Sequence, residues 1–130
     1  MFMKIITLIL CLYCGVAYSQ SRIGHKKERI LSEIENSIDT VLNGKHRVIF
    51  KSTTNYTHFY FLDSCGVCIH SMIICLDDFG KNLLVKSFDV ITKRESDSLN
   101  VWFDEVENVY IYLLFNDDYK KYYFWFEKDK

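Results

Sequence analysis

The last third of the chain alternates apolar and aromatic residues in two runs, and this alternation constrains the fold more than any other feature. Residues 109–115 and 122–126 form the two runs, and a short polar segment joins them. Successive side chains of a β-strand point to opposite faces, so one face of each run must cover a core and the other must point away. We therefore expect a C-terminal β-hairpin within a larger sheet.

The hairpin face that points away from the core carries the candidate binding residues. Tyrosine and tryptophan are favoured at binding surfaces because they offer a large contact area with a polar tip. The alternative is that these residues have only a structural role, either beneath a helix that covers this face or as cross-strand aromatic pairs that stabilise the sheet. The candidate binding residues are Tyr110, Tyr112, Tyr123 and Trp125.

The segment from residue 22 to residue 42 predicts a long amphipathic helix. Its apolar residues recur with the spacing of a single helical stripe. Asn43 and Gly44 follow, and glycine readily takes the left-handed conformation that closes a helix. The apolar positions are Ile23, Ile30, Leu31, Ile34, Ile38, Val41 and Leu42.

β-Branched and aromatic runs predict further strands between this helix and the hairpin. Residues 47–51 and 57–62 form two of them. Residues 67–76 fit either a helix or a strand. The glycine-containing segment 77–82, followed by the apolar residues 83–85, favours two strands joined by a loop. We therefore interpret 67–76 as a strand.

A short second helix is expected before the C-terminal hairpin. Apolar residues there are spaced i, i+3, i+4 and i+7, and Ser96 or Asp97 is the expected N-cap. The expected fold is α+β: the N-terminal amphipathic helix packs on an antiparallel sheet of five or six strands. The apolar positions of the short helix are Leu99, Trp102, Phe103 and Val106.

The stretch from Ser71 to Val106 is similar in its order of elements to the C-terminal domain of TonB. It contains an Asp-x-x-Gly-Lys turn that begins at Asp77, set in an expected hairpin that precedes the short amphipathic helix. The resemblance covers about a quarter of the chain. It implies an α+β layout and carries no implication for activity.

The first nineteen residues have the pattern of a cleavable secretory signal peptide. A lysine near the start precedes an apolar run, and a small-x-small sequence ends at Ser19. We expect cleavage between Ser19 and Gln20, which leaves residues 20–130 as one exported domain, periplasmic or extracellular, with no membrane contact in the mature form. An uncleaved anchor is the alternative, although the run is shorter than the roughly twenty apolar residues that a span needs.

Charge and cysteine content narrow the function classes. The chain has 16 basic and 17 acidic residues, and they interleave, whereas a nucleic-acid-binding protein usually carries a basic stripe that displaces counterions. We expect no nucleic-acid partner.

Beyond the signal only Cys65, Cys68 and Cys75 remain. Two of them are free to pair, but three cannot make a disulfide scaffold, so a hydrophobic core must hold the fold.

Cys65-Gly66-Val67-Cys68 is the one recognisable reactive motif. Two thiols at this spacing can form a strained, reducible disulfide and lower each other's pKa. With an apolar strand before it, the motif resembles that of thioredoxin-like oxidoreductases, which implies thiol-disulfide exchange at Cys65 and Cys68. Ser64 stands where that family has an aromatic residue, and the chain has no proline to supply the family's cis-proline. The alternative is a tight turn at Gly66 with structural cysteines.

His70 and Cys75 extend this motif to a possible zinc-ligand set, since zinc accepts thiolates and imidazole. On a strand over 67–76, however, alternation would put Cys68 and His70 on one face and Cys75 on the other. We therefore expect no metal and no other cofactor. The weaker alternative is a zinc site formed by Cys65, Cys68, His70 and Cys75.

The sequence predicts a small exported binding module without catalysis. It has no G-x-S-x-G, H-E-x-x-H or glycine-rich phosphate loop. The expected partner is a protein or a glycan, engaged through the aromatic face or the loops, as an inhibitor or immunity-type protein would do. The enzyme alternative is a thiol-disulfide oxidoreductase, which requires an exposed Cys65 at the N-terminus of a helix. The binding interpretation instead places Cys65 and Cys68 at a β-turn and a strand start.

Overall fold

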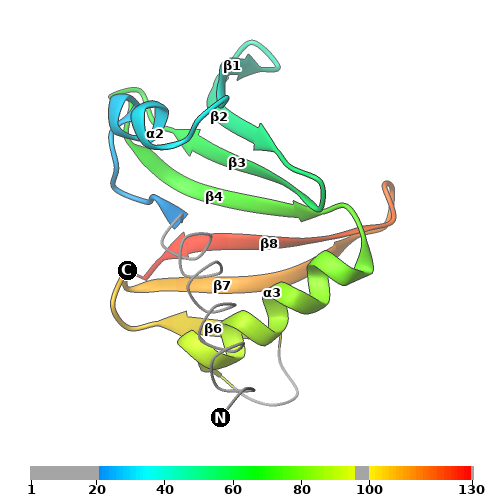
Figure 1. Ribbon diagram of the computed structural model, residues 1–130. Coiled ribbons are helices and arrows are strands. Elements are labelled where there is room, and N and C mark those ends of the chain that lie inside the picture. Colours follow the sequence, from blue (N-terminus) through cyan, green and yellow to red (C-terminus); the bar gives the residue numbers. More distant parts are fainter. Residues whose placement is uncertain (1–20, 96–99, 130) are drawn as a thin grey trace.

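The computed structural model describes residues 21–95 and 100–129, and its main element is one antiparallel sheet (Figure 1). Within these residues the sheet has eight strands in the order β1-β2-β3-β4-β8-β7-β6-β5. The described helices are α2 (Lys27–Glu33) and α3 (Asp78–Ile91), and neither is long and apolar enough to cross a membrane. The strands are β1 (Ile38–Leu42), β2 (His46–Ser52), β3 (Tyr56–Leu62), β4 (Cys68–Cys75), β5 (Lys93–Arg94), β6 (Val101–Asp104), β7 (Val109–Asn116) and β8 (Lys121–Lys128).

The two halves of the sheet meet where β4 pairs with β8. Strands β1 to β4 form a meander, after which α3 carries the chain to the far edge at β5. Strands β6, β7 and β8 then return towards the middle. Helix α3 packs on one face of this second half (Figure 1), where Leu84 and Phe88 join a buried cluster with strand residues such as Trp102 and Phe124.

Helix α2 covers the same face at the other end of the sheet. Its residue Ile30 is fully buried, and together with Ile34 it packs against Ile49, Tyr60 and Leu62 of β2 and β3. Tyr60 is opposite Ser71 in the register, and Ser71 is opposite Phe126 of the first cluster. Both clusters therefore lie on one side of the sheet. We call this side the covered face and the opposite side the open face.

The expected long N-terminal helix is wrong, because a hairpin replaces its second half. Residues Ile38–Leu42 form β1, which pairs with β2. Asn43 and Gly44 have φ of 52° and 70°, and the Lys45 N–H donates to the Leu42 carbonyl over 3.1 Å. An Asn-Gly pair favours positive φ at both central residues of such a turn, and residues 43–45 separate the paired residues Leu42 and His46. The Asn-Gly pair therefore marks a hairpin turn and does not close a helix.

The expected strand over residues 83–85 is also wrong, since these residues lie within α3. The carboxylate of Asp77 accepts a 2.7 Å hydrogen bond from the Gly80 N–H, which caps the start of the helix. Leu84, Ser87 and Phe88 then fall on one buried face. The Asp-x-x-Gly-Lys segment begins a helix here, so the hairpin that gave the likeness to TonB is absent from this segment.

The expected short helix over residues 99–106 is wrong, because its described residues form a strand and a turn. Val101–Asp104 form β6, and the side chain of Trp102 is fully buried while Val106 is 91% exposed. The carboxylate of Asp104 accepts hydrogen bonds from the Val106 and Glu107 N–H groups and so fixes the turn that follows. The expected N-caps at residues 96 and 97, Leu99 and the signal peptide lie outside the described residues.

Five predicted strands agree with the structure at the level of elements. Strands at 47–51, 57–62 and 67–76 correspond to β2, β3 and β4, and the C-terminal hairpin is β7 with β8. An α+β fold with an antiparallel sheet is therefore correct in outline. The expected arrangement of one long helix on five or six strands is not, because the sheet has eight strands and both described helices are shorter or placed elsewhere.

Candidate functional site

The C-terminal hairpin divides its side chains between the two faces as alternation predicts. Val109, Ile111, Phe124 and Phe126 are at most 1% exposed and lie in the core of the covered face. The intervening residues point to the open face, where they are only partly buried. All four candidate binding residues, Tyr110, Tyr112, Tyr123 and Trp125, therefore share the open face.

The neighbouring strands extend this aromatic surface. Trp125 is opposite Met72 on one side and Tyr112 on the other. Met72 is in turn opposite Phe59, and Phe59 is opposite Phe50. The register thus aligns a row of apolar and aromatic side chains across β2, β3, β4, β8 and β7. Such rows stabilise a sheet through cross-strand contacts, and on an open face they also offer a continuous apolar surface.

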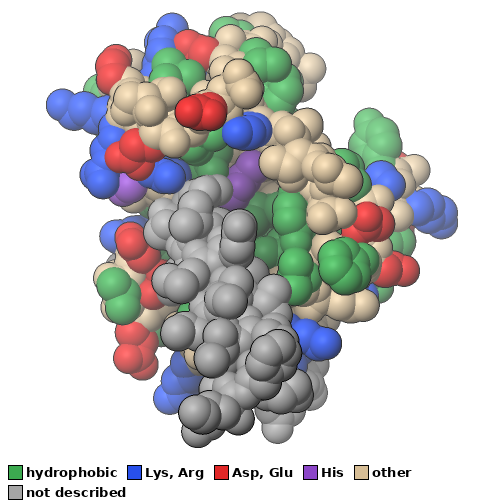
Figure 2. Space-filling model, viewed as in Figure 1, with side chains coloured by type: hydrophobic (Ala, Val, Ile, Leu, Met, Phe, Trp, Pro, Cys, Tyr) green, Lys and Arg blue, Asp and Glu red, His purple; other side chains and the backbone are tan. Residues whose placement is uncertain are grey.

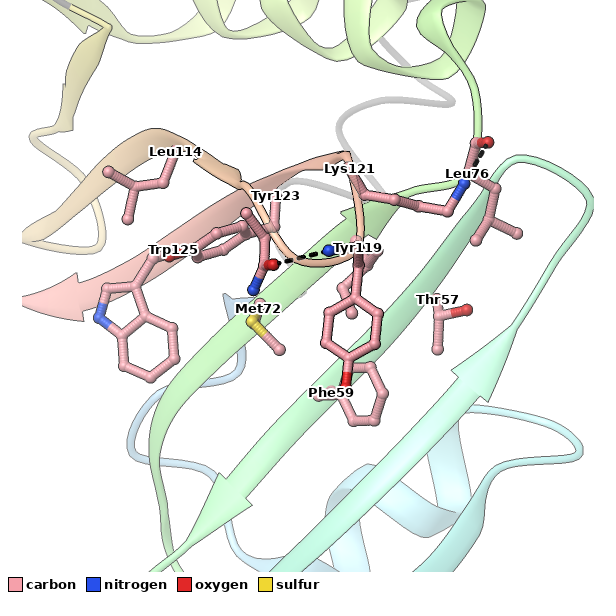
Figure 3. Close-up of a pocket in the computed structure, with 11 residues that line it drawn as sticks. Thr57, Phe59, Met72, Leu76, Leu114, Tyr119, Lys121, Tyr123 and Trp125 are labelled. Atoms are coloured by element: carbon pink, nitrogen blue, oxygen red, sulfur yellow. Dashed lines mark hydrogen bonds between the residues drawn. The ribbon is translucent and has the colours of Figure 1, made fainter.

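A groove of about 750 Å³ lies along this row (Figure 3). Its floor is built from alternate residues of β3, β4, β8 and β7, and its lining is predominantly apolar. The volume and lining match those of small-molecule sites, which are mostly concave, apolar and rich in aromatic side chains. The lining residues are Thr57, Phe59, Met72, Ile74, Leu76, Leu114, Asn116, Tyr119, Lys121, Tyr123 and Trp125.

The turn between β7 and β8 supplies one wall of the groove. The amide oxygen of Asn116 accepts hydrogen bonds of 3.0 Å from the N–H groups of Asp118 and Tyr119, which fixes the turn. Tyr119 is 78% exposed, and Figure 3 shows its ring projecting from the turn over the groove floor. An aromatic ring held in this position has one face available to a ligand.

Lys121 is the one charged residue among the eleven that line the groove. Its side chain runs towards the end of β4 (Figure 3), where the ammonium donates a 3.4 Å hydrogen bond to the Leu76 carbonyl. None of the four ion pairs found within the described residues includes Lys121. The groove therefore has a partly buried positive charge at one end.

Two of the four candidate binding residues line this groove and two do not. Tyr123 and Trp125 belong to its floor. Tyr110 and Tyr112 lie further along the open face, where Tyr110 contacts Phe103 and Tyr112 at ring-centroid distances of 4.7 and 6.1 Å. The pKa of Tyr112 is raised by partial burial and by the nearby Glu127 carboxylate.

Sequence reasoning missed the groove residues outside the hairpin. Phe59, Met72 and Ile74 could have been found from the alternation within β3 and β4, because they occupy the same face as Tyr123 and Trp125. No comparable pattern identified Tyr119. The position of Tyr119 depends on the path of the turn, whereas Lys121 is the first residue of β8 and lies on the same face as Tyr123 and Trp125.

The Cys65-Gly66-Val67-Cys68 motif forms a turn and the start of a strand. The Asp63 carboxylate accepts hydrogen bonds from the Cys65 and Val67 N–H groups at 2.8 and 2.9 Å, and Gly66 has a φ of 78°. Cys65 is exposed, Cys68 is the buried first residue of β4, and both are free thiols. Burial raises the pKa of Cys68 to about 12, which disfavours its thiolate.

The extended zinc-ligand set is not assembled. A register shift next to Leu62 places Cys68 opposite that residue, whereas His70 is opposite Phe61. Cys68 therefore lies on the covered face and His70 on the open face, which corrects the expectation that they share one. Cys75 is in the other buried cluster of the covered face. Within the described residues, no three His, Cys, Asp or Glu side chains are grouped to hold a metal ion.

Charged side chains intermingle by sign around α2 on the face of the molecule seen in Figure 2. Lys27 pairs with Asp39 at 2.8 Å, and Arg29 with Glu33 at 2.8 Å. Exposed pairs of this kind contribute little to stability, about 0 to 1 kcal/mol each. They describe a solvated surface and do not add to the groove.

The comparisons with known proteins give no relative for this fold or this site. The chain matches no protein-family model, no curated protein and no solved structure.

Proposed function

We propose that this chain is an exported, non-catalytic binding module whose ligand occupies the groove on the open face. The observation that carries the proposal is the groove itself: about 750 Å³, lined mainly by apolar and aromatic side chains, on the side of the sheet opposite the core. Covering this surface removes apolar area from water, which stabilises a complex by roughly 25 cal/mol for each Å². A ligand of small-molecule size and apolar character fits this lining best.

The sparse polar lining favours an apolar ligand over a glycan. Sugar hydroxyls need several hydrogen-bonding partners, and some of the polar atoms in the groove already have partners. The Asn116 amide oxygen accepts from the turn, and the Thr57 hydroxyl hydrogen-bonds to Ser52 at 3.0 Å. The rings of Tyr119, Tyr123 and Trp125 supply mainly apolar contact.

A protein partner is the second candidate, and the aromatic surface beyond the groove favours it. Phe103, Tyr110 and Tyr112 continue the open face across β6 and β7. A protein would use this larger area together with the groove, whereas a small ligand would use the groove alone. Substitutions at Tyr110 therefore distinguish the two candidates, because they should weaken binding only of a protein partner.

The features of the cysteine motif support a function without thiol catalysis. Redox catalysis at such a motif needs a nucleophilic thiolate of lowered pKa, commonly at the start of a helix. Cys65 lies in a turn, and the buried Cys68 has a raised pKa. If the protein nevertheless reduced disulfides catalytically and lost this activity in Cys65→Ser, the non-catalytic proposal would be wrong.

The proposal of export depends on residues 1–19 alone, through their apolar run and the cleavage sequence before Gln20. N-terminal sequencing of the protein recovered from its host tests it. The expected first residue is Gln20. An intact chain that begins at Met1 in the cell interior would contradict export without affecting the groove.

The groove is tested with a matched pair of substitutions on β7. Leu114 lines the groove and is 42% exposed, while its neighbour Phe115 points to the other face and is 44% exposed. We expect Leu114→Glu to weaken binding of the neutral fluorescent probe N-phenyl-1-naphthylamine by about tenfold or more, because it places a charge in an apolar site. Phe115→Glu should leave the dissociation constant within about twofold.

Fluorescence titration of the purified protein measures both dissociation constants, and thermal unfolding confirms that both variants are folded. Equal loss in the two variants would indicate binding elsewhere. Absence of probe binding by the unsubstituted protein would overturn the proposed site.

A further inference from the structure

We propose that the ligand of this groove is an amphiphile with an unbranched alkyl chain and a terminal carboxylate, and that Lys121 binds the carboxylate. This inference rests on the proposed function and adds the chemical class of the ligand. It is carried by the position of one positive charge at one end of a predominantly apolar groove. A carboxylate is the complementary group for an ammonium, and the apolar lining requires the remainder of the ligand to be apolar.

Lys121 retains hydrogen-bonding capacity for such a ligand. An ammonium has three donors. One of them reaches the Leu76 carbonyl at 3.4 Å, which is long for a hydrogen bond to a charged donor. No described carboxylate forms an ion pair with this ammonium. A bound carboxylate would therefore satisfy donors that the described residues leave open.

The opposite end of the same strand carries the opposite charge. Lys121, Trp125 and Glu127 all project to the open face, because they are separated by even numbers of residues on β8. Glu127 is opposite Tyr110 and His70 in the register. Its carboxylate would repel an anion at that end, so the charges fix one orientation: the carboxylate at Lys121 and the end of the alkyl chain towards Trp125.

The distance between these ends suits a medium-length alkyl chain. Lys121 and Trp125 are four residues apart on one strand, which corresponds to about 13 Å at roughly 3.3 Å per residue. Met72, Ile74 and Tyr123 line the path between them. Met72 adds adaptability, because an unbranched thioether side chain conforms to ligands of varied shape.

The test compares dodecanoate with dodecanol, which has the same chain length and no charge. Displacement of N-phenyl-1-naphthylamine from the purified protein at pH 7.5 gives both affinities. We expect dodecanoate to bind about tenfold more tightly than dodecanol, since a charge-assisted hydrogen bond in a partly buried site contributes more than a neutral one. Raising the salt concentration should reduce this ratio.

Two matched lysine substitutions locate the effect. Lys121→Met removes the ammonium and keeps the apolar stem, and we expect it to make the two affinities equal within about twofold. Lys120→Met changes an exposed lysine of the same turn that does not line the groove, so the tenfold ratio should persist.

The outcomes separate this inference from the proposed function. If dodecanol and dodecanoate bind equally well, or if the preference survives in Lys121→Met, the inference is wrong while the groove remains a ligand site. If neither ligand binds and neither displaces the probe, both are wrong. If sedimentation shows a stable dimer that excludes the probe, the occupant is a second copy of the chain and the inference also fails.

Discussion

At the scale of single residues, His58 is the clearest case of a side chain whose chemistry depends on the fold. It lies on the covered face, where its ring stacks against Tyr60 at 4.6 Å and Phe126 at 6.4 Å. Its Nε2 atom is buried and has no hydrogen-bond partner among the described residues. Burial, together with the positive charge of Arg22, lowers the pKa of His58 from 6.5 to about 3.

This pKa shift predicts a loss of stability in acid. Between pH 6.5 and about 3 the unfolded chain protonates His58 whereas the folded chain keeps it neutral. The unfolded state therefore binds more protons, and the free energy of unfolding falls as the pH falls, by at most ~1.4 kcal/mol per pH unit from this group. We expect His58→Phe to reduce this slope, as measured by urea unfolding at pH 7, 6, 5 and 4.

His46 provides the control for this measurement, because it is an exposed histidine of β2. His46→Gln should keep the slope of the unsubstituted protein. A His58→Phe protein whose stability depends on pH as steeply as that of the unsubstituted protein would show that His58 is not the group responsible.

At the scale of elements, the start of α3 packs closely against the start of β3. A Cβ atom added at Gly80 would lie 2.9 Å from Cε1 of Tyr56 and 3.2 Å from Cβ of Asn55. The Tyr56 hydroxyl also donates a 3.3 Å hydrogen bond to the Gly80 carbonyl. Glycine at this position therefore lets the helix approach the sheet.

Gly80→Ala should destabilise the protein although alanine favours helices. The added methyl group must displace Tyr56 or the helix, and overpacking of this kind costs typically 1–3 kcal/mol. Asn82→Ala, on the exposed side of the same helix, should be neutral or slightly stabilising. Denaturant unfolding compares the two variants. A stability of Gly80→Ala equal to that of Asn82→Ala would contradict the close approach.

Strands were predictable from the sequence where alternation was long and regular. Burial alternates over the first four residues of β7 and over residues 123–127 of β8, so both the hairpin and its faces could be assigned. The N-terminal helix failed because apolar spacing over short segments suits either a helix or a strand, and the Asn43-Gly44 pair suits either a helix end or a hairpin turn. Tertiary pairing with β2 decides between them.

Helix α3 was missed because its start resembles a glycine-containing loop. An aspartate followed three residues later by a glycine is common both in loops and at the start of a helix. Only the 2.7 Å hydrogen bond between Asp77 and Gly80 shows that they form a helix cap. The opposite error was made for residues 101–104, which form a strand where a helix was expected. Trp102 and Phe103 were assigned to one face of that helix, but as neighbours on β6 they lie on opposite faces of the sheet. Spacing over four residues could not distinguish the two periods.

At the scale of the whole molecule, the candidate site results from how the two halves of the sheet join. Trp125 and Tyr123 come from the end of the chain, whereas Phe59 and Met72 come from the first half. The pairing of β4 with β8 brings them together. Local alternation could identify Tyr123 and Trp125, but no local signal could reveal their neighbours or the groove between them.

The molecule's two tryptophans lie on opposite faces of the sheet and so provide an internal comparison. Trp125 lines the groove, while Trp102 is fully buried on the covered face with its indole N–H donating to Asp89 at 2.7 Å. Because their surroundings differ, we expect the two indole N–H groups to give separate signals in a ¹⁵N-¹H correlation spectrum.

The most direct test of the proposed site is to follow these two signals during a titration with dodecanol. Ligand in the groove should shift the Trp125 indole signal in a saturable manner and leave the Trp102 signal in place. A Trp125 signal that stays unchanged while dodecanol binds, or a shift confined to Trp102, would contradict a ligand site on the open face.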